Sequence, residues 1–281
     1  MNQGSFGYAV KAVRYGLFVP VPFALVDAFV TEKPFSGNPA GVVLLEKWPA
    51  NETLPGIAAE MNQAETAFLV PNGSQYELRW FTPTVEVTLC GHATLASAAA
   101  LSMWNNEVPS QSYEFTSASG LLTCSSVDGQ SWTLNFPVAP VEESRLPDCL
   151  DFVTKQSTWT GHYGDDWLAE FESETDIVSF VPDFGLIRQA AKRGLVITAR
   201  SGEDEFVYRF FAPQSGVDED HATGSAQTGL LPFWVSRGST SKLRSRQLSP
   251  RGAGFTSEID GDRVRITGQT RLVVSGTLYD H

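Results

Sequence analysis

The feature that most constrains the fold of this chain is a pattern that occurs twice, in residues 79–101 and again in residues 209–231. Each copy begins with Arg-x-Phe-x-Pro and passes through a turn-rich segment. It then reaches a His-Ala-Thr triplet, at His92 and at His221, that opens a run of small, helix-compatible residues. Aligned on their first arginines, the copies need one insertion or deletion to come into register. Such self-similarity indicates a duplication, and two half-domains that face each other would place both helix starts at a shared cleft.

Composition and charge indicate a globular protein with an acidic surface. The 281 residues are enough for two domains that each bury a core, and 24 Gly and 16 Pro suit strands and tight turns better than a helical bundle. The net charge of −12, with a pI near 4.8, disfavours contact with phosphate backbones and anionic membranes. We therefore expect no nucleic-acid partner. Much of the acidity lies in residues 142–176, which we interpret as a solvated face.

The location of the protein is inferred mainly from missing signals. No apolar run approaches the roughly 18 residues that a membrane span requires, so we expect no membrane partner. Residues 1–22 carry Lys11 and Arg14 but lack a continuous apolar core and a clear cleavage site, which argues against a secretory signal. These residues form an extension of unknown role. A cytoplasmic location is the default expectation.

The motifs of the common cofactor and metal sites are missing from the sequence. There is no G-x-G-x-x-G that opens a helix after a strand, no P-loop and no Gly-x-Ser-x-Gly. Cys90, Cys124 and Cys149 form no C-x-x-C and have no metal-ligand spacing, so neither a disulfide framework nor a zinc site is indicated. We predict no cofactor and no metal, which leaves proton transfer or simple hydrolysis by side chains.

Glu65 stands where a helix predicted over residues 51–62, with Asn51 as a plausible cap, gives way to a strand predicted over residues 65–70. A carboxylate at such a junction would be half enclosed, and partial burial raises a carboxyl pKa and makes the group a better base near neutral pH. The alternative is a solvent-facing glutamate at the start of a strand. The residues alone leave both interpretations open.

Polar groups gather at the two predicted helix starts. Cys90-Gly91-His92 precedes an Ala-rich helix whose unpaired N–H groups could hold a carboxylate, and a glycine there lets a ligand approach the main chain. In the second copy, Asp220 stands beside Thr223, Gly224 and Ser225, which bring an acid and two hydroxyl groups into a small volume. A structural role in capping or packing is the alternative for His92 and for Asp220.

These residues belong to stretches that resemble the phenazine-biosynthesis (PhzF-like) isomerase family, which shares the diaminopimelate-epimerase fold. The matching stretches run in family order from about residue 23 to the C-terminus, so the resemblance does not depend on a single motif. They are VDAFVTEKPFSGNPAGVVLL at 26–45, MNQAETAFLV at 61–70, LRWFTPTVEVTLCGHATLASA at 78–98, FFAPQSGVDEDHATGSA at 210–226 and GDRVRITGQ at 261–269.

The resemblance implies an α+β fold of two pseudo-symmetric domains, each a curved, mostly antiparallel sheet around a central helix. The half-domains would span residues 23–136 and 137–281, and whether the final strand packs on the N-terminal half is left open. The implied activity is cofactor-independent movement of a proton between carbons of a small carboxylated metabolite. Family analogy also suggests a homodimer.

The resemblance assigns roles to particular residues around the cleft. Glu65 would be the general acid/base, and Asp220 and His92 would position the substrate and assist the transfer. The other implied substrate-binding residues are Gly91, Ser225, Gly224, Thr223 and Cys90.

The chain departs from the family pattern at two positions near the second helix start. His221 follows the motif's Asp, and Gln227 stands where close relatives of the second motif have His, which bears on substrate recognition. Two other functions stay open. One is an amino-acid racemase or epimerase; no cysteine follows Cys149, so a two-thiol mechanism is excluded, although a Cys90/Asp220 or Glu65/Asp220 pair is not. The other is a non-catalytic small-molecule binder.

Overall fold

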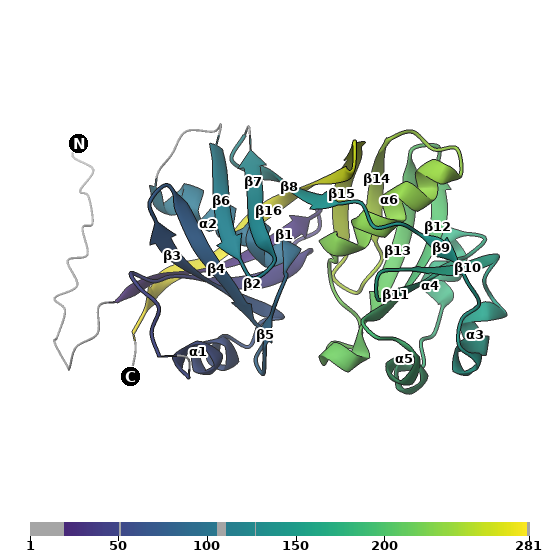
Figure 1. Ribbon diagram of the computed structural model, residues 1–281, viewed down its shortest axis with the longest axis horizontal. Helices are drawn as coiled ribbons and strands as arrows, with labels where there is room; N and C mark the ends of the chain where they lie inside the picture. The colour runs from purple at the N-terminus through teal and green to yellow at the C-terminus, as the bar shows by residue number, and fades with distance from the viewer. Residues whose placement is uncertain (1–19, 51, 106–110, 127, 280–281) are drawn as a thin grey trace, which may run out of the picture.

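The computed structural model describes residues 20–50, 52–105, 111–126 and 128–279. Two lobes lie side by side, and in each a sheet wraps around a central helix (Figure 1). The helix is α2 (Gly91–Asn105) in the first lobe and α6 (Gln227–Ser236) in the second. The predicted α+β class with two pseudo-symmetric halves is confirmed. Whether the halves fold as domains with the boundaries 23–136 and 137–281 stays a prediction.

The remaining elements of the first lobe are eight strands and one outer helix, α1 (Thr53–Met61). The strands are β1 (Val21–Val30), β2 (Asn38–Leu44), β3 (Glu65–Asn72), β4 (Gln75–Phe81), β5 (Glu86–Val87), β6 (Gln111–Ser117), β7 (Gly120–Ser126) and β8 (Ser131–Pro137).

The second lobe is built from a similar set of strands and helices, with more helices on its outer side. Its helices are η1 (Asp148–Leu150), α3 (Asp151–Thr154), α4 (Glu174–Ser179), α5 (Phe184–Ala190), η2 (Pro213–Ser215) and η3 (Gly224–Ala226). Its strands are β9 (Glu142–Glu143), β10 (Trp159–Tyr163), β11 (Asp166–Glu170), β12 (Gly194–Gly202), β13 (Glu205–Phe211), β14 (Lys242–Gln247), β15 (Ala253–Asp260) and β16 (Arg263–Leu278).

One strand-pairing scheme is used twice. In the first lobe β1–β2 is antiparallel, β2–β3 parallel, β3–β4 antiparallel, β4–β6 parallel, and β6–β7 and β7–β8 antiparallel. The strands from β10 to β16 repeat this succession of pairings. A parallel pair needs a crossover connection, and helices of the same lobe supply each one. The repeated topology supports the duplication inferred from the sequence.

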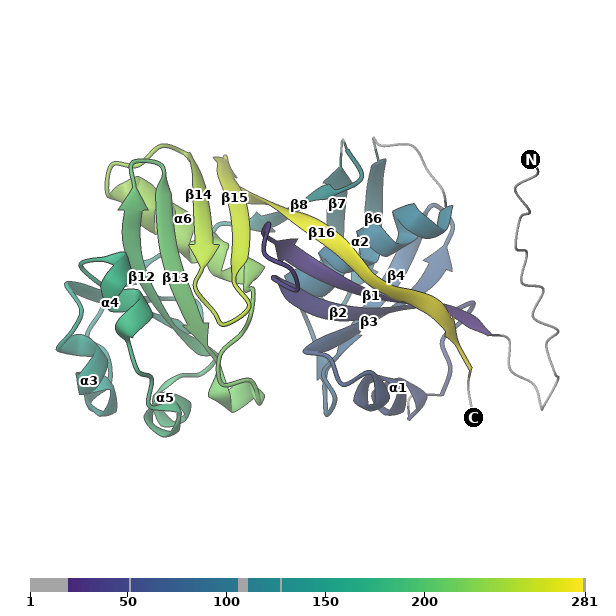
Figure 2. The same ribbon diagram turned by 180° about the vertical axis from the view of Figure 1, so that it is seen from behind.

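One strand of the second lobe extends across the junction into the first lobe. β16 pairs with β8 through residues 263–269 and then continues across the first lobe to pair with β1 (Figure 2). β9, which follows β8 in the chain, pairs with β10 within the second lobe. β16 is 16 residues long because it pairs with strands of both lobes.

Small side chains allow the first sheet to close tightly around α2. Ala93, Ala96 and Ala98 are fully buried in one core cluster that also includes residues around α6. Alanine favours a helix and occupies little volume, so the strands can approach the helix closely. Two smaller hydrophobic clusters lie under the outer helices, one in each lobe. Among the described residues, no helix is long and apolar enough to cross a membrane.

The structure corrects the alignment of the two helix starts. His92 is the second residue of α2, whereas His221 precedes Thr223, the N-cap of the 3₁₀ turn that leads into α6. The residues that directly precede the two helical segments are Cys90 and Thr223. The triplets are alike in sequence, but the helix begins one residue before His92 in the first copy and three residues after His221 in the second. The predicted cap Asn51 lies outside the described residues.

Candidate active site

A cleft of about 480 Å³ lies between the lobes and brings together all the site residues that the sequence predicted. The first wall comes from the start of β3 and the start of α2, and the second wall from the loop before η3 and from η3 itself. The predicted residues that line it are Glu65, Cys90, Gly91, His92, Asp220, Thr223, Gly224 and Ser225.

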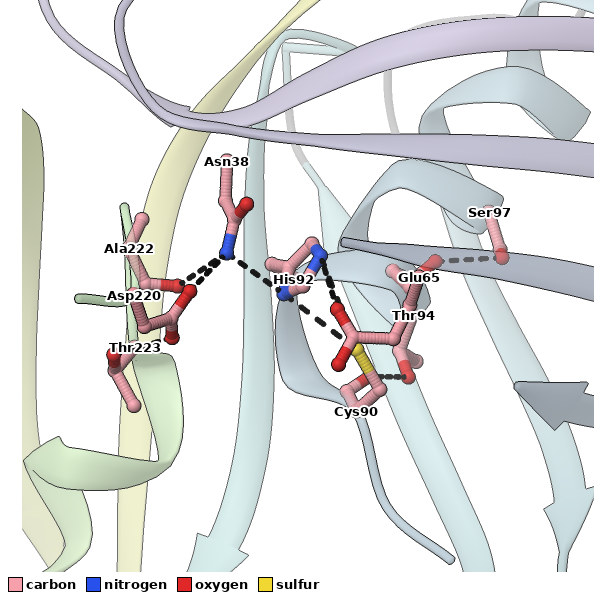
Figure 3. Close-up of polar contacts among 10 residues, drawn as sticks. Asn38, Glu65, Cys90, His92, Thr94, Ser97, Asp220, Ala222 and Thr223 are labelled. Carbon is pink, nitrogen blue, oxygen red and sulfur yellow. Dashed lines mark hydrogen bonds and ion pairs between the residues drawn. The ribbon is translucent and has the colours of Figure 1, made fainter. Parts of the chain in front are cut away.

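Glu65 and His92 form the central contact of the first wall (Figure 3), with Glu65 Oε2 3.2 Å from His92 Nε2. Their side chains are only 21% and 7% exposed, so little solvent competes for this contact. Burial, and to a lesser degree the charge of Asp220, raises the pKa of Glu65 to about 8. Burial also lowers the pKa of His92 below its ordinary value. At neutral pH the pair is therefore a carboxylic acid beside a neutral imidazole.

The hydrogen-bond network indicates which nitrogen of His92 carries the proton. The Asn38 amide nitrogen lies 3.3 Å from His92 Nδ1, and an amide NH₂ group can only donate. His92 Nδ1 is then an acceptor, so Nε2 carries the proton and donates to Glu65 Oε2. This arrangement fixes one carboxyl oxygen of Glu65, and the Cys90 thiol also hydrogen-bonds to the Glu65 carboxyl group.

Cys90 lies behind this pair. Its sulfur is 3.5 Å from His92 Nδ1, and burial raises the pKa of the thiol well above its ordinary value, as does the nearby Glu65. Glu65, Cys90 and His92 each offer a donor atom, and these atoms lie within 4.8 Å of one another. The cysteine spacing alone did not indicate such a group, because Glu65 comes from a different strand. Because the raised pKa leaves little thiolate near neutral pH, Cys90 is a poor base in this environment.

Asp220 is held on the opposite wall by neutral donors. Its Oδ2 accepts from Thr223 Oγ1 at 2.5 Å, and its Oδ1 accepts from the Asn38 amide at 2.7 Å. The backbone around it is fixed by Gln247, which donates to Asp220 O and accepts from Thr223 N–H, each at 2.6 Å. The two oxygens of the Asp220 carboxyl group thus point toward Asn38 and Thr223 (Figure 3).

Asn38 is a site residue to which the sequence interpretation gave no role. It is fully buried and lies between His92 and Asp220 (Figure 3). The turn before it is tied to the second lobe, because Gly37 N–H donates to Gly252 O at 2.7 Å and Arg251 Nε donates to Gly37 O at 2.8 Å. Gly37 has φ +78°, and a Cβ there would lie 2.4 Å from Ala28 O. The SGNP turn in the family-matching stretch was the available signal.

The two predicted binding glycines have different surroundings. A Cβ on Gly224 would lie 2.9 Å from the ring of Phe29, which belongs to the other lobe, so close packing explains this glycine. A Cβ on Gly91 would make only ordinary contact with Phe136. Whether either amide faces a ligand stays a prediction.

Neither departure from the family pattern lines the cleft. Gln227 is fully buried inside the second lobe, where its Oε1 accepts from Ser245 Oγ at 3.1 Å and Ser257 Oγ at 3.2 Å. His221 lies next to Asp220 but is absent from the cleft lining, and its carbonyl accepts from Ser249 Oγ. An effect of these two residues on a ligand would therefore be indirect.

Comparison with known proteins places this geometry in a family. The model of the phenazine biosynthesis-like (PhzC-PhzF) proteins matches residues 26–276. An uncharacterized isomerase of Pseudomonas aeruginosa is 41% identical over 257 residues, covering 91% of this chain and 97% of that protein. The crystal structure of a PhzF-family protein of Enterococcus faecalis has a TM-score of 0.85 at 35% identity and covers 93% of this chain and all of its own. A hydroxyproline epimerase of Agrobacterium vitis, at 12% identity and a TM-score of 0.62 over 92% of each chain, shares the fold alone.

Proposed function

Because the chain belongs to the phenazine biosynthesis-like PhzC-PhzF family, whose relatives include proteins named as isomerases, we propose that it is a cofactor-independent isomerase. In this proposal it moves a proton between carbons of a small carboxylated metabolite by general acid/base catalysis. Glu65 is the acid/base, and Asp220 and His92 assist the transfer.

The observation that carries the proposal is the environment of Glu65. The Glu65 carboxyl group is enclosed in the cleft and hydrogen-bonded to a neutral imidazole, and its pKa is raised to about 8. A group with these properties is suited to proton transfer near neutral pH. Such a group is a stronger base when ionised than an exposed glutamate. It is also still acidic enough to return the proton to carbon.

The proposed reaction has two proton steps. The Glu65 carboxylate takes a proton from an activated C–H bond, and the electron pair left behind delocalises into the adjoining unsaturated or carbonyl group of the substrate. The protonated Glu65 exchanges its proton with solvent and then delivers a proton to another carbon, which shifts the double bond without net change in composition. The N–H of His92 holds one oxygen of Glu65 in place through both steps.

The second wall has a positioning role in this proposal. Asp220 accepts hydrogen bonds from Asn38 and Thr223 and would accept another from a hydroxyl or ammonium group of the substrate. Ser225 and the helix starts at Gly91 and Gly224 would contact other polar groups. Orientation of the reacting carbon over Glu65 supplies the part of the rate enhancement that acid/base catalysis does not.

The proposal is tested by a screen of small carboxylated metabolites in D₂O, followed by mass spectrometry and NMR. An isomerase places deuterium on a carbon other than the one deprotonated and yields a product with a shifted double bond. The rate should rise with pH and level off above about 8, because only ionised Glu65 can remove the proton. No exchange on any substrate of the screen would favour the non-catalytic binder.

An epimerase is the second candidate, because the fold is shared with a hydroxyproline epimerase. In a two-thiol enzyme each half would contribute one cysteine. Here Cys90 directly precedes α2, and the residue that directly precedes the second helical segment is Thr223. Epimerisation would therefore have to pair Glu65 or Cys90 with Asp220. Deuterium at the α-carbon of an amino acid, without movement of a double bond, would identify this activity.

A further inference from the structure

Among the described residues, the cleft contains a single permanently positive side chain. Glu65 and Asp220 contribute carboxyl groups from opposite walls, while Arg193 is the only lysine or arginine among the described residues that line the cleft. The chain as a whole carries a net charge of −12, so an anionic ligand receives no general attraction from the surface. We therefore expect an anion to bind at the end of the cleft that contains Arg193.

Arg193 is fixed in place on the second wall. It lies between α5 and β12, its backbone N–H donates to Asp165 O at 3.1 Å, and its guanidinium stacks over the ring of Phe210 at 5.2 Å. Nη2 donates to Ser225 Oγ at 2.5 Å, which leaves the hydroxyl hydrogen of Ser225 free to point elsewhere. The Arg193 guanidinium thus contacts Ser225, a predicted substrate-binding residue, at the surface of the cleft.

A buried carboxylate stands behind the guanidinium. Asp166 Oδ2 lies 3.2 Å from Arg193 Nη1, and the Asp166 side chain is only 1% exposed, whereas that of Arg193 is 41% exposed. The sequence placed Asp166 in a segment interpreted as a solvated face, and the structure corrects that interpretation for this residue. A buried acid on one side and the open cleft on the other orient the remaining N–H donors of Arg193 toward a ligand.

We propose that Arg193, with the Ser225 hydroxyl, binds the single carboxylate of the substrate and so determines that the enzyme acts on monocarboxylates. This inference rests on the proposed function, because it places the reacting carbon of the substrate toward Glu65. Val87, Leu89 and Phe210 line the cleft as well and would contact an apolar or unsaturated body. A second carboxylate placed near the Asp220 carboxylate would be repelled by it.

Binding of three probes tests the assignment without knowledge of the substrate. Benzoate, benzamide and isophthalate share one ring and differ in having one, no or two carboxylates, and isothermal titration calorimetry gives their affinities for the full chain. Wild type should bind benzoate at least tenfold more tightly than either of the others. Arg193→Gln should weaken benzoate about 10- to 100-fold, the range expected for a charge-assisted hydrogen-bonded contact, and leave benzamide unchanged.

Control variants separate binding from folding. Arg193→Gln leaves Asp166 buried without its cation, so the double variant Asp166→Asn/Arg193→Gln removes both charges and should show the same loss. Arg193→Lys should retain part of the affinity because it keeps the charge without the planar fork. Arg200→Gln is the matched control, since Arg200 stacks on Trp234 at 5.0 Å in the same lobe but does not line the cleft, and it should bind like wild type.

The inference is overturned if wild type does not prefer benzoate to benzamide, or if the folded double variant binds benzoate within twofold of wild type. Its failure can be told from that of the proposed function through Glu65→Gln. That variant should keep Arg193-dependent benzoate binding even if no substrate for proton transfer is ever found. Conversely, Glu65-dependent exchange on a substrate that is indifferent to Arg193→Gln would leave the proposed function in place and contradict only the role of Arg193.

Discussion

The side-chain amide of Asn38 donates to Asp220 Oδ1 at 2.7 Å, and the same nitrogen lies 3.3 Å from His92 Nδ1. One neutral residue thus joins the two walls of the cleft and sets the tautomer of the histidine that holds Glu65. The turn before Asn38 is hydrogen-bonded to Gly252 and Arg251 of the second lobe, so this turn also fixes the position of one lobe relative to the other.

Replacing Asn38 should therefore lower turnover without removing a proton-transfer group. Asn38→Ala deletes the donor to Asp220 and His92, and we expect a loss of about 10- to 100-fold in kcat/KM, as hydrogen bonds to charged groups are worth about 1.5–3 kcal/mol. Asn38→Asp should lose more, because it adds a carboxylate beside Asp220. The measurement is the rate of deuterium incorporation. Asn72→Ala, which changes an exposed asparagine bonded to Glu77, is the control, and equal rates for it and Asn38→Ala would contradict the prediction.

The raised pKa of Glu65 predicts a pH-dependent difference in stability. The folded state holds the proton up to about pH 8, whereas the unfolded chain releases it near 4.5. Glu65 thus favours the folded state below the unfolded pKa, and this contribution is lost as pH rises through the folded pKa. Urea unfolding of wild type and Glu65→Gln should show wild type losing stability relative to the variant between these values, by up to about 1.4 kcal/mol per pH unit. A constant difference across this range would show that the pKa is ordinary.

Cys90 should be dispensable for proton transfer between carbons. Its thiol is buried and its pKa is raised, so little thiolate forms near neutral pH. We expect Cys90→Ser to keep turnover within a few-fold of wild type and the wild-type thiol to react slowly with iodoacetamide. Loss of activity in Cys90→Ser, together with exchange at the α-carbon of an amino acid, would instead support the epimerase.

Gln247 should matter for stability as well as for the site. It is fully buried and satisfies both Asp220 O and Thr223 N–H. Gln247→Met keeps the volume but leaves these two backbone groups unpaired, which should cost about 2 kcal/mol or more in the free energy of unfolding. Gln269→Met, at an exposed position of β16, is the control and should change stability by less than about 0.5 kcal/mol. Equal unfolding midpoints would mean that Gln247 has no such role.

Much of the first wall could be predicted from local sequence. Glu65 does begin the strand that follows a helix, and Gly91 does begin a helix, because hydrophobic periodicity and glycine position report local backbone structure. The internal repeat correctly indicated two similar halves. It misaligned His221 with His92, since matching letters do not specify the residue at which a helix begins.

The rest of the site depends on contacts between distant parts of the chain. Asn38 is uncharged and stands in a turn, so nothing in its local pattern indicates that it meets Asp220 from the other lobe. The sequence interpretation gave Arg193 no role, and it included Asp166 only as one acid among many in a segment interpreted as solvated. Their pairing becomes visible only when β11 and β12 lie side by side. The length of β16 likewise follows from its pairing with strands of both lobes.

The central claim is that Glu65 moves the proton, and the most direct test is the rate of deuterium incorporation from D₂O into one identified substrate by wild type and by Glu65→Gln. The account predicts that the variant, folded and with Arg193-dependent benzoate binding intact, incorporates deuterium at least about 100-fold more slowly, the lower limit typical of general acid/base catalysis. Incorporation by Glu65→Gln within about threefold of wild type would contradict it, since ΔΔG‡ would then be below about 0.7 kcal/mol.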